Sequence, residues 1–327
     1  MNDRTQNPQE LIVKFEKQLQ RFSMMNPEEA QAWYAELNED LDLLFSHWSI
    51  SRFSINPDAY MGLVLECHSA KYGSVVIKLY PPFLQERYYK ESYVFRTLQN
   101  YCQCTLLDEF PGKYAMLLEK VTPGTYISYP RDAGAIEGLF RQMKKYRQPI
   151  SILDNLEPAI LGVLEQAEWE YPLSKKYGYH PELISYLLET AKAVYNEHFS
   201  EEEVYLLHGD VYFKNALLDT NGVRIIDPFG YRDSYIFEYM PFFTYELLLH
   251  SEPQNYQRDF LQLKTFFSGF TDTSKFYAAA FVFLVRQLIP SIHEGNDHFQ
   301  RADRYLSLIR SLYLNEHDIL EWKVKIV

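Results

Sequence analysis

Residues 206–230 read "LLHGDVYFKNALLDTNGVRIIDPFG", a stretch in which polar residues interrupt apolar runs typical of β-strands. The runs "NALLD" and "VRIID" are joined through Asn221 and Gly222, the strongest short signal for a β-hairpin. If these two residues form the loop, Asn215 and Asp227 lie diagonally across the open end of the hairpin. The stretch therefore predicts a hairpin whose open end presents two oxygen ligands to one ion.

A third oxygen donor, Asp210, precedes this hairpin by a short loop. A Mg²⁺ ion held by Asn215 and Asp227, beside a carboxylate that accepts a proton, suits phosphoryl transfer from a nucleotide. The spacing of Asp210, Asn215 and Asp227 is that of a kinase catalytic loop followed by its metal-binding aspartate. The alternative is structural: His208 and Asp210 cap a turn, Asn215 closes a loop and Asp227 ends a strand.

Composition excludes several classes of protein. The chain has 327 residues, 47% of them hydrophobic, which is enough for two lobes with sizeable cores. Its net charge of −12 argues against nucleic acid or an anionic membrane as the main partner. The densest apolar run, at 276–285, is too short to cross a bilayer, and no signal-peptide pattern opens the sequence. We therefore expect a cytoplasmic protein without nucleic-acid or membrane partners.

The three cysteines are Cys67, Cys102 and Cys104. An odd number without a regular framework argues against disulfides, and Cys102 with Cys104 is at best half of a metal site. We expect reduced thiols with structural roles.

Helical spacing dominates residues 8–47. Asn26 and Pro27 form a helix start signal, and apolar residues recur after it at helical intervals. The recurring residues are Trp33, Leu37, Leu41, Leu44 and Phe45. This part of the chain is predicted to be a helical N-terminal arm.

The pattern then changes to short segments rich in β-branched residues and separated by turn signals. Five such segments predict an antiparallel sheet: 48–55, 62–69, 73–80, 104–110 and 113–121. A helical pattern at 83–101 lies between the third and fourth segments, and helical patterns dominate from 133 to 200 and from 240 onward. We place a lobe boundary at 121–125. The predicted organisation is an arm at 1–47, a small lobe at 48–121 and a large lobe at 122–327.

The stretch at 206–230 resembles the His-Gly-Asp-x4-Asn and Ile-Asp-Pro-x-Gly signature of the aminoglycoside phosphotransferase and choline kinase superfamily. The Asp-Pro-x-Gly ending most resembles the streptomycin and hydroxyurea kinase branch. Upstream, "VVIKLY", Glu91 and "MLLEKVTPG" occur in the order expected of that branch. The similarity spans about 30 to 240 and is strongest over 206–230. It implies an α+β, two-lobed protein-kinase-like fold, with an antiparallel five-stranded small lobe and a mainly helical large lobe.

The resemblance also implies roles for individual residues. Asp210 would be the catalytic base, with His208 bracing its loop, and Asn215 and Asp227 would hold magnesium. Lys78 would contact the α- and β-phosphates of ATP.

Glu91 would pair with Lys78, as the resemblance implies. The residues alone leave two alternatives open. In the first, Lys78 lies at a strand edge and extends its ammonium group to water. In the second, Glu86 takes the role assigned to Glu91 on the following helix. The adenine would hydrogen-bond to backbone near the lobe boundary, around Leu118, Glu119 and Val121.

Two features depart from this pattern. The loop at 54–62 has only Gly62 where kinases place a glycine-rich turn over the phosphates. This leaves open weaker nucleotide binding, a preference for GTP, or a chain without activity. The segment after Asp227 is bulkier and more aromatic than expected of a streptomycin kinase, so the acceptor need not be streptomycin. Within it, Asp233 and Glu238 are candidates for contact with a cationic or sugar-like acceptor.

The sequence therefore predicts an enzyme that transfers the γ-phosphoryl group of ATP, with Mg²⁺, to a hydroxyl of an aminoglycoside-like or other small acceptor. Alternatives are a kinase for an amino alcohol, a sugar or a homoserine-type metabolite. A catalytically silent nucleotide-binding protein of the same shape is the alternative from another class. Apart from the nucleotide and the acceptor, no partner is predicted.

Overall fold

The computed structural model describes most of the chain. The described residues are 22, 26–56, 59, 61–99, 101–150, 156, 160, 162, 164, 181–293 and 296–313. The helical prediction for 8–21, part of the loop at 54–62 and the helical predictions for 165–180 and 314–327 lie outside them. Within the described ranges, no helix combines the length and the apolar character that a membrane span needs.

The chain divides into two compact units. The first contains residues 1–125 together with 217–226, and the second contains 126–216 together with 227–327. The predicted hairpin is thus grouped with the first unit, although the residues on either side of it belong to the second.

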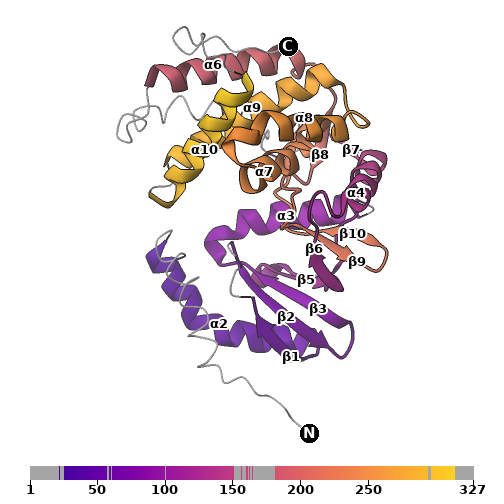
Figure 1. Ribbon diagram of the computed structural model, residues 1–327. Helices are drawn as coiled ribbons and strands as arrows, with labels where there is room; N and C mark the ends of the chain where they lie inside the picture. Colours follow the sequence, from indigo (N-terminus) through magenta and orange to yellow (C-terminus); the bar gives the residue numbers. More distant parts are fainter. Residues whose placement is uncertain are drawn as a thin grey trace. The chain divides into compact units, whose positions relative to one another are not determined.

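The first unit contains a five-stranded antiparallel sheet, as predicted (Figure 1). Its strands follow the spatial order β1-β2-β3-β5-β4. They are β1 (Ile50–Ile55), β2 (Leu63–Ser69), β3 (Gly73–Leu79), β4 (Leu106–Phe110) and β5 (Ala115–Glu119). Together with the helices described in the second unit, this sheet confirms the predicted α+β class.

The two faces of this sheet are covered by different helices, α2 (Pro27–His47) and α3 (Gln85–Thr97). Side chains alternate between faces along a strand. On β3, Val75, Ile77 and Leu79 therefore belong to the core cluster that includes α2. Val76 points to the opposite face and packs in the cluster that includes α3. Lys78 follows the same alternation, so the strand itself directs the lysine toward α3.

Helix α2 begins where its sequence predicts. Asn26 is the N-cap, its side chain accepts a hydrogen bond from the Glu29 N–H over 3.3 Å, and Pro27 occupies the first turn. Its apolar residues at helical spacing, Trp33, Leu37, Leu41 and Leu44, are all buried. They pack against the sheet in one cluster, so this part of the arm belongs to the core of the first unit.

The hairpin predicted from Asn221 and Gly222 is present, but its loop is shifted by one residue. Strand β9 (Ala216–Asp219) ends before Thr220, and β10 (Gly222–Ile225) already begins at Gly222. Asp219 explains the shift, because its Oδ1 accepts a hydrogen bond from the Asn221 N–H over 2.5 Å and closes the turn earlier. These strands form a small sheet in the order β10-β9-β6, where β6 is Pro123–Tyr126.

A third sheet, in the order β11-β8-β7, was not predicted. Its strands are β7 (Gln148–Pro149), β8 (Val204–Leu207) and β11 (Tyr231–Ser234), and β11 pairs antiparallel with β8. The polar sequence "YRDS" of β11 carries no apolar alternation, so it lacks the usual strand signal. This pairing places the residues after β8 beside those before β11.

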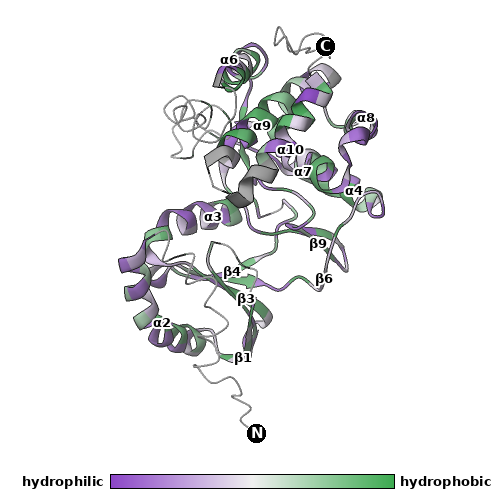
Figure 2. Cartoon of the chain, turned by 60° about the vertical axis from the view of Figure 1, so that its left-hand side comes forward, coloured by the Kyte–Doolittle hydropathy of each residue, from purple (hydrophilic) through white to green (hydrophobic). Residues whose placement is uncertain are grey.

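Besides these strands, the described part of the second unit contains several helices. Its helices are α4 (Ala133–Tyr146), α6 (Pro181–His198), α7 (Met240–His250), α8 (Tyr256–Phe267), α9 (Thr273–His293) and α10 (Asn296–Tyr313). Every residue from Ala278 to Val285 on α9 is buried, which confirms the predicted central helix. Figure 2 shows α9 largely in the green of hydrophobic residues.

All three cysteines are free and buried, which confirms the prediction of reduced thiols. Burial raises the pKa values of Cys67 and Cys102 to about 12. Neither thiol is therefore a reactive nucleophile at neutral pH.

Candidate active site

Lys78 and Glu91 form a buried ion pair in the first unit. Lys78 Nζ donates to Glu91 Oε1 over 2.7 Å and to Oε2 over 2.9 Å. Only 6% of Lys78 and none of Glu91 is exposed to solvent. Because such charges are expensive to bury alone, the pair holds the ammonium group in one place.

Neighbouring residues settle which acid meets the lysine. Tyr80 also donates to Glu91 Oε2, and the Arg87 guanidinium lies 3.9 Å from the same oxygen. Glu86 is instead exposed and pairs with Lys90 over 2.9 Å. Burial and the charge of Glu91 raise the pKa of Tyr80, so its phenol stays protonated and remains a donor.

The backbone around Leu118, Glu119 and Val121, which was predicted to bind adenine, already forms hydrogen bonds within the protein in part. Leu118 pairs with Val76 and Leu106 within the sheet. The Glu119 N–H donates to Thr105 O over 2.8 Å. Val121 follows the end of β5 and is half-buried.

In the second unit, Asp210 and Asn215 are brought together as their spacing predicts. Asn215 Nδ2 donates to Asp210 Oδ2 over 2.7 Å and to the Asp210 carbonyl over 3.0 Å. Asn215 is 6% exposed, and its own N–H donates to Tyr212 O over 2.9 Å, which closes the loop. The amide thus orients the carboxylate and uses its nitrogen to do so, which leaves the amide Oδ1 as the side chain's only possible metal ligand.

The backbone groups of His208 and Gly209, which precede Asp210, are held in place by hydrogen bonds. Their N–H groups donate to Glu238 Oε2 over 2.7 Å and to Glu238 Oε1 over 2.9 Å. His208 is fully buried, and its carbonyl accepts from the Phe229 N–H over 2.7 Å. His208 and Glu238 therefore brace the loop from two sides.

Gly209 is required by this geometry. Its φ of +78° lies in the left-handed region, and a Cβ there would lie 2.5 Å from Cδ2 of Tyr231. Only glycine lets the chain pass the Tyr231 ring and turn toward Asp210.

Asp227 lies in the left-handed region as well, with a φ of +59°. A non-glycine residue there costs about 1–2 kcal/mol, a strain that clusters at functional sites. Two residues later, the hydrogen bond from Phe229 to the carbonyl of His208 ties this segment to the loop of Asp210. The backbone thus brings Asp227 to the segment that carries Asp210 and Asn215.

The donor set fits a magnesium ion. Mg²⁺ is typically bound by one or two carboxylates together with substrate phosphates, and one amide oxygen with one aspartate meets that requirement. Among the residues described, no group of three or more His, Cys, Asp or Glu side chains is placed to hold a metal.

Asp233 and Glu238, the acids predicted to face the acceptor, are both turned inward. Asp233 is 2% exposed, and it accepts hydrogen bonds from Tyr195 OH over 2.9 Å and from the Ile160 N–H over 3.1 Å. Burial raises its pKa to about 6. Glu238 is fully buried and accepts a hydrogen bond from the backbone of the loop that carries Asp210. An acidic residue within an aromatic segment indicates that its carboxylate has hydrogen-bond partners inside the protein. Burying a carboxylate without such partners is costly.

Glu246 on α7 is a candidate that the sequence did not reveal. It is 5% exposed, and its Oε2 has no hydrogen-bond partner among the described residues. Burial raises the pKa of Glu246 to about 7. Burial and the charge of Glu246 together raise the pKa of Tyr129. The adjacent Tyr245 packs on Tyr212, with ring centroids 4.7 Å apart, so this part of α7 lies beside the loop of Asp210.

Comparisons with solved structures identify the fold. A thermostable mutant of the aminoglycoside phosphotransferase APH(4)-Ia matches with a TM-score of 0.58 and 15% identity, over 83% of this chain and 98% of that one. Choline kinase from Cryptosporidium parvum matches with a TM-score of 0.58 and 12% identity, over 83% and 90%. Ethanolamine kinase from Plasmodium vivax matches with a TM-score of 0.56 and 10% identity, over 80% of each chain. The chain has the fold of these small-molecule kinases.

This kinase fold is shown by structure and not by sequence. A scan against protein-family models and a search of the curated proteins found no match. Two of the similar structures are ternary complexes of the aminoglycoside phosphotransferase, with ADP or AMP-PNP and hygromycin B. The aminoglycoside phosphotransferase and the choline and ethanolamine kinases match almost equally well, so the kinase fold does not select an acceptor or the streptomycin and hydroxyurea branch.

Proposed function

We propose that this protein is a small-molecule kinase that transfers the γ-phosphoryl group of ATP to a hydroxyl group. The observation that carries the proposal is the 2.7 Å hydrogen bond from Asn215 Nδ2 to Asp210 Oδ2. It fixes a carboxylate, half-buried and next to a candidate metal ligand, on a loop that is braced from both sides. Catalysis of phosphoryl transfer depends largely on such rigid positioning of the reacting groups.

In the proposed reaction, Asp210 orients the acceptor hydroxyl and receives its proton. The hydroxyl oxygen forms a bond to the γ-phosphorus, the bond from that phosphorus to the β,γ-bridging oxygen breaks, and ADP leaves. His208 acts through the backbone of the loop and does not touch the reacting atoms, because its side chain is fully buried.

Asn215 and Asp227 are the proposed ligands of Mg²⁺. Bound magnesium would neutralise charge on the phosphates. The strained φ of Asp227 supports this role, because the backbone holds the residue in a conformation that packing alone would not favour.

Lys78 is the proposed contact for the α- and β-phosphates of the nucleotide. The two carboxylate oxygens of Glu91 and the ring of Tyr80, whose centroid lies 5.4 Å from the ammonium, hold Lys78 Nζ in one place. For adenine, we propose backbone contacts at Val121, because the N–H groups of Glu119 and Lys120 already donate to Thr105 O and Ser74 O.

The acceptor is proposed to be small and cationic. Glu246 supports this, because a buried carboxyl oxygen without a partner gains most from an ammonium group. Tyr212 and Tyr245 add aromatic surface that favours cations. An aminoglycoside, an amino alcohol and a homoserine-type metabolite all meet this description, whereas an uncharged sugar does not.

Two measurements test the proposal. In a thermal-shift titration, Mg-ATP at millimolar concentration should raise the melting temperature, and Lys78→Met should weaken that shift. A screen of hydroxyl compounds that follows ADP release should then identify an acceptor. Stabilisation by Mg-ATP without ADP release from any acceptor would support the catalytically silent alternative, and the absence of any stabilisation would contradict nucleotide binding itself.

A further inference from the structure

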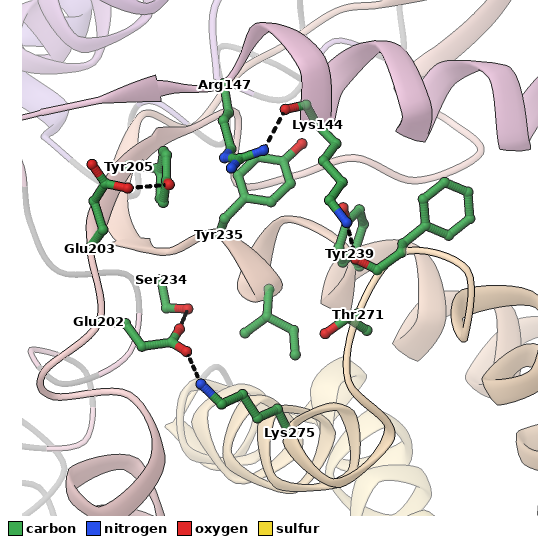
Figure 3. Close-up of a pocket in the computed structure, with 12 residues that line it drawn as sticks. Lys144, Arg147, Glu202, Glu203, Tyr205, Ser234, Tyr235, Tyr239, Thr271 and Lys275 are labelled. Carbon is green, nitrogen blue, oxygen red and sulfur yellow. Dashed lines mark hydrogen bonds and ion pairs between the residues drawn. The ribbon is translucent and has the colours of Figure 1, made fainter.

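A cavity of about 290 Å³ lies in the second unit, away from the loop of Asp210 (Figure 3). It is lined by the end of α4, the start of β8, the end of β11 and the segment between α8 and α9. We call it the Arg147 cavity, after one of the residues that line it. Its volume is near the lower end of the range for small-molecule sites.

The cavity lies at the opposite end of β8 from the catalytic loop. Val204, at the start of β8, pairs with Ser234, which lines the cavity. Leu207, at the end of β8, pairs with Tyr231, whose ring contacts Gly209. A strand rises about 3.3 Å per residue, so roughly 10 Å of β8 separates the two ends. The cavity is therefore not part of the proposed active site.

Two cations on one side of the cavity have no carboxylate partner within the described part of the chain. Lys144 Nζ donates to the carbonyl of Phe270 over 2.6 Å. Arg147 donates to the carbonyl of Lys144 over 2.8 Å, and its guanidinium also interacts with the hydroxyl and the ring of Tyr205, whose centroid lies 5.2 Å away. No acid of the described residues lies within ion-pair distance of either. Lysine has three donors and arginine five, so each cation keeps donors for a ligand.

Of the other charged residues that line the cavity, Lys275 and Glu202 pair with each other, and Glu203 is bonded to a neutral hydroxyl group. Lys275 forms an ion pair with Glu202, which also accepts from Ser234. Glu203 accepts from Tyr205 OH. Figure 3 shows the pair of Glu202 and Lys275 across the open centre from Lys144 and Arg147. With three cations and two carboxylates, the lining carries one net positive charge. Because Lys275 and Glu202 neutralise each other, this charge is the sum over Lys144, Arg147 and Glu203.

A buried hydroxyl group gives a second, independent sign of a ligand. Tyr239 lines the cavity and is 1% exposed, and its OH has no hydrogen-bond partner among the described residues. The ring centroid of Tyr235 lies 5.5 Å away at 89°. Burial raises the pKa of Tyr239, and the Tyr235 side chain acts in the opposite direction and lowers it. An unpartnered buried hydroxyl costs about 1–3 kcal/mol, which a polar ligand atom would recover.

The walls are aromatic. Tyr235, Tyr239 and Phe270 line the space, and the Arg147 guanidinium lies 5.7 Å from the ring centroid of Tyr235. Flat apolar surfaces beside cationic donors suit a ligand that has a ring and an anionic group.

We propose that the Arg147 cavity is a second ligand site, which binds a small anion that carries a ring. The anionic group lies between Lys144 and Arg147, and the ring lies against Tyr235 and Phe270. The shared chemistry is that of an aryl carboxylate or an aryl phosphate. This site does not depend on the proposed kinase activity.

The test is calorimetric titration of the full-length protein with three probes: phenyl phosphate, benzoate and benzylamine. At least one of the two anions should bind at millimolar concentration or below, and the stronger one identifies the natural anionic group. Benzylamine, which has the ring with the opposite charge, should not bind. Absence of binding by both anions, or equal binding of benzylamine, would overturn the proposal.

Variants locate the binding. Lys144→Met and Arg147→Met should each weaken binding of the preferred anion by about 10- to 100-fold, because each removes charge-assisted hydrogen bonds. Lys145→Met is the matched control, since Lys145 is an exposed lysine on the same helix. Tyr239→Phe, which removes one oxygen atom, should weaken binding by roughly three- to tenfold, and it covers the case in which a charge variant fails to fold. Anion affinity unchanged in Tyr239→Phe and in the folded charge variants would place the binding elsewhere and refute the site.

Discussion

Glu238 Oε2 accepts a hydrogen bond over 2.7 Å from the backbone N–H of His208, thirty residues earlier in the chain. The second oxygen of the same carboxylate accepts from the N–H of Gly209, so one buried acid satisfies two consecutive backbone donors of the loop that carries Asp210. In the proposed mechanism, Glu238 therefore positions Asp210 without touching the reacting groups.

Glu238→Gln should lower kcat much more than it changes the KM for ATP. Glutamine keeps one acceptor oxygen but presents an NH₂ group to the other backbone donor, which leaves that donor without a partner. The free energy of unfolding should fall by about 1–3 kcal/mol. Steady-state kinetics and urea unfolding measure the two effects. Glu252→Gln, at an exposed position in the same unit, is the control, and an equal loss of activity in both variants would contradict the role of Glu238.

A double-mutant cycle on the free energy of unfolding tests the Lys78–Glu91 pair. Lys78→Met leaves Glu91 buried without its main partner and should cost about 3–5 kcal/mol of unfolding free energy. The double variant Lys78→Met/Glu91→Leu should regain much of that loss, because it removes the isolated charge. It should not regain affinity for Mg-ATP.

Urea unfolding and nucleotide titration of the single and double variants separate these two outcomes. Lys71→Met, which changes an exposed lysine of the same unit, should leave both quantities unchanged. Recovery of nucleotide affinity in the double variant would show that the lysine does not contact the phosphates.

Glu246 predicts a specific dependence of stability on pH. Its pKa is raised from 4.5 to about 7 in the folded protein, so between these values the folded state binds more protons than the unfolded state. The free energy of unfolding therefore falls as pH rises from about 4.5 to 7, by about 3 kcal/mol from this group. Asp233, with its pKa raised to about 6, adds a decrease in the same direction over a lower pH range.

Glu246→Gln should remove the upper part of this decrease, so that the variant is more stable than the wild type at pH 8 and not at pH 4. Thermal unfolding as a function of pH measures the difference, with the exposed Glu197→Gln as control. Identical pH profiles for Glu246→Gln and the wild type would show that the carboxyl group is not buried in its neutral form.

Glu246 also predicts a proton effect of the acceptor. If a cationic acceptor pairs with the carboxylate of Glu246, the pKa of Glu246 falls on binding, and protons are released at pH 6.5. Calorimetry in buffers with different ionisation enthalpies counts those protons. Binding of the acceptor without proton release would place its cation elsewhere.

The sequence predicts those parts of the fold that repeat a local pattern. The five strands of the first sheet, the N-cap at Asn26 and the buried helix α9 follow directly from alternation, capping chemistry and apolar content. The contact between Asp210 and Asn215 also follows, because it depends on a spacing of five residues within one loop.

Other features depend on contacts that the local sequence does not encode. Strand β11 is polar and forms because β8 lies beside it. Asp233 and Glu238 look like exposed acids in an aromatic segment, but their partners come from distant segments. The hairpin loop is shifted by one residue because the side chain of Asp219 competes with the Asn-Gly preference. The Arg147 cavity combines segments more than a hundred residues apart, which only the tertiary structure brings together.

The most direct test of the central claim compares ADP release from Mg-ATP, in the presence of the acceptor, between the wild type and Asp210→Asn. The variant should lose turnover by about 10²- to 10⁴-fold, the usual contribution of a general base, while its melting temperature and affinity for Mg-ATP stay close to those of the wild type. Asp219→Asn, in the same stretch of sequence but paired with Arg224, should keep its activity. Turnover by Asp210→Asn at the wild-type rate would contradict phosphoryl transfer through this loop.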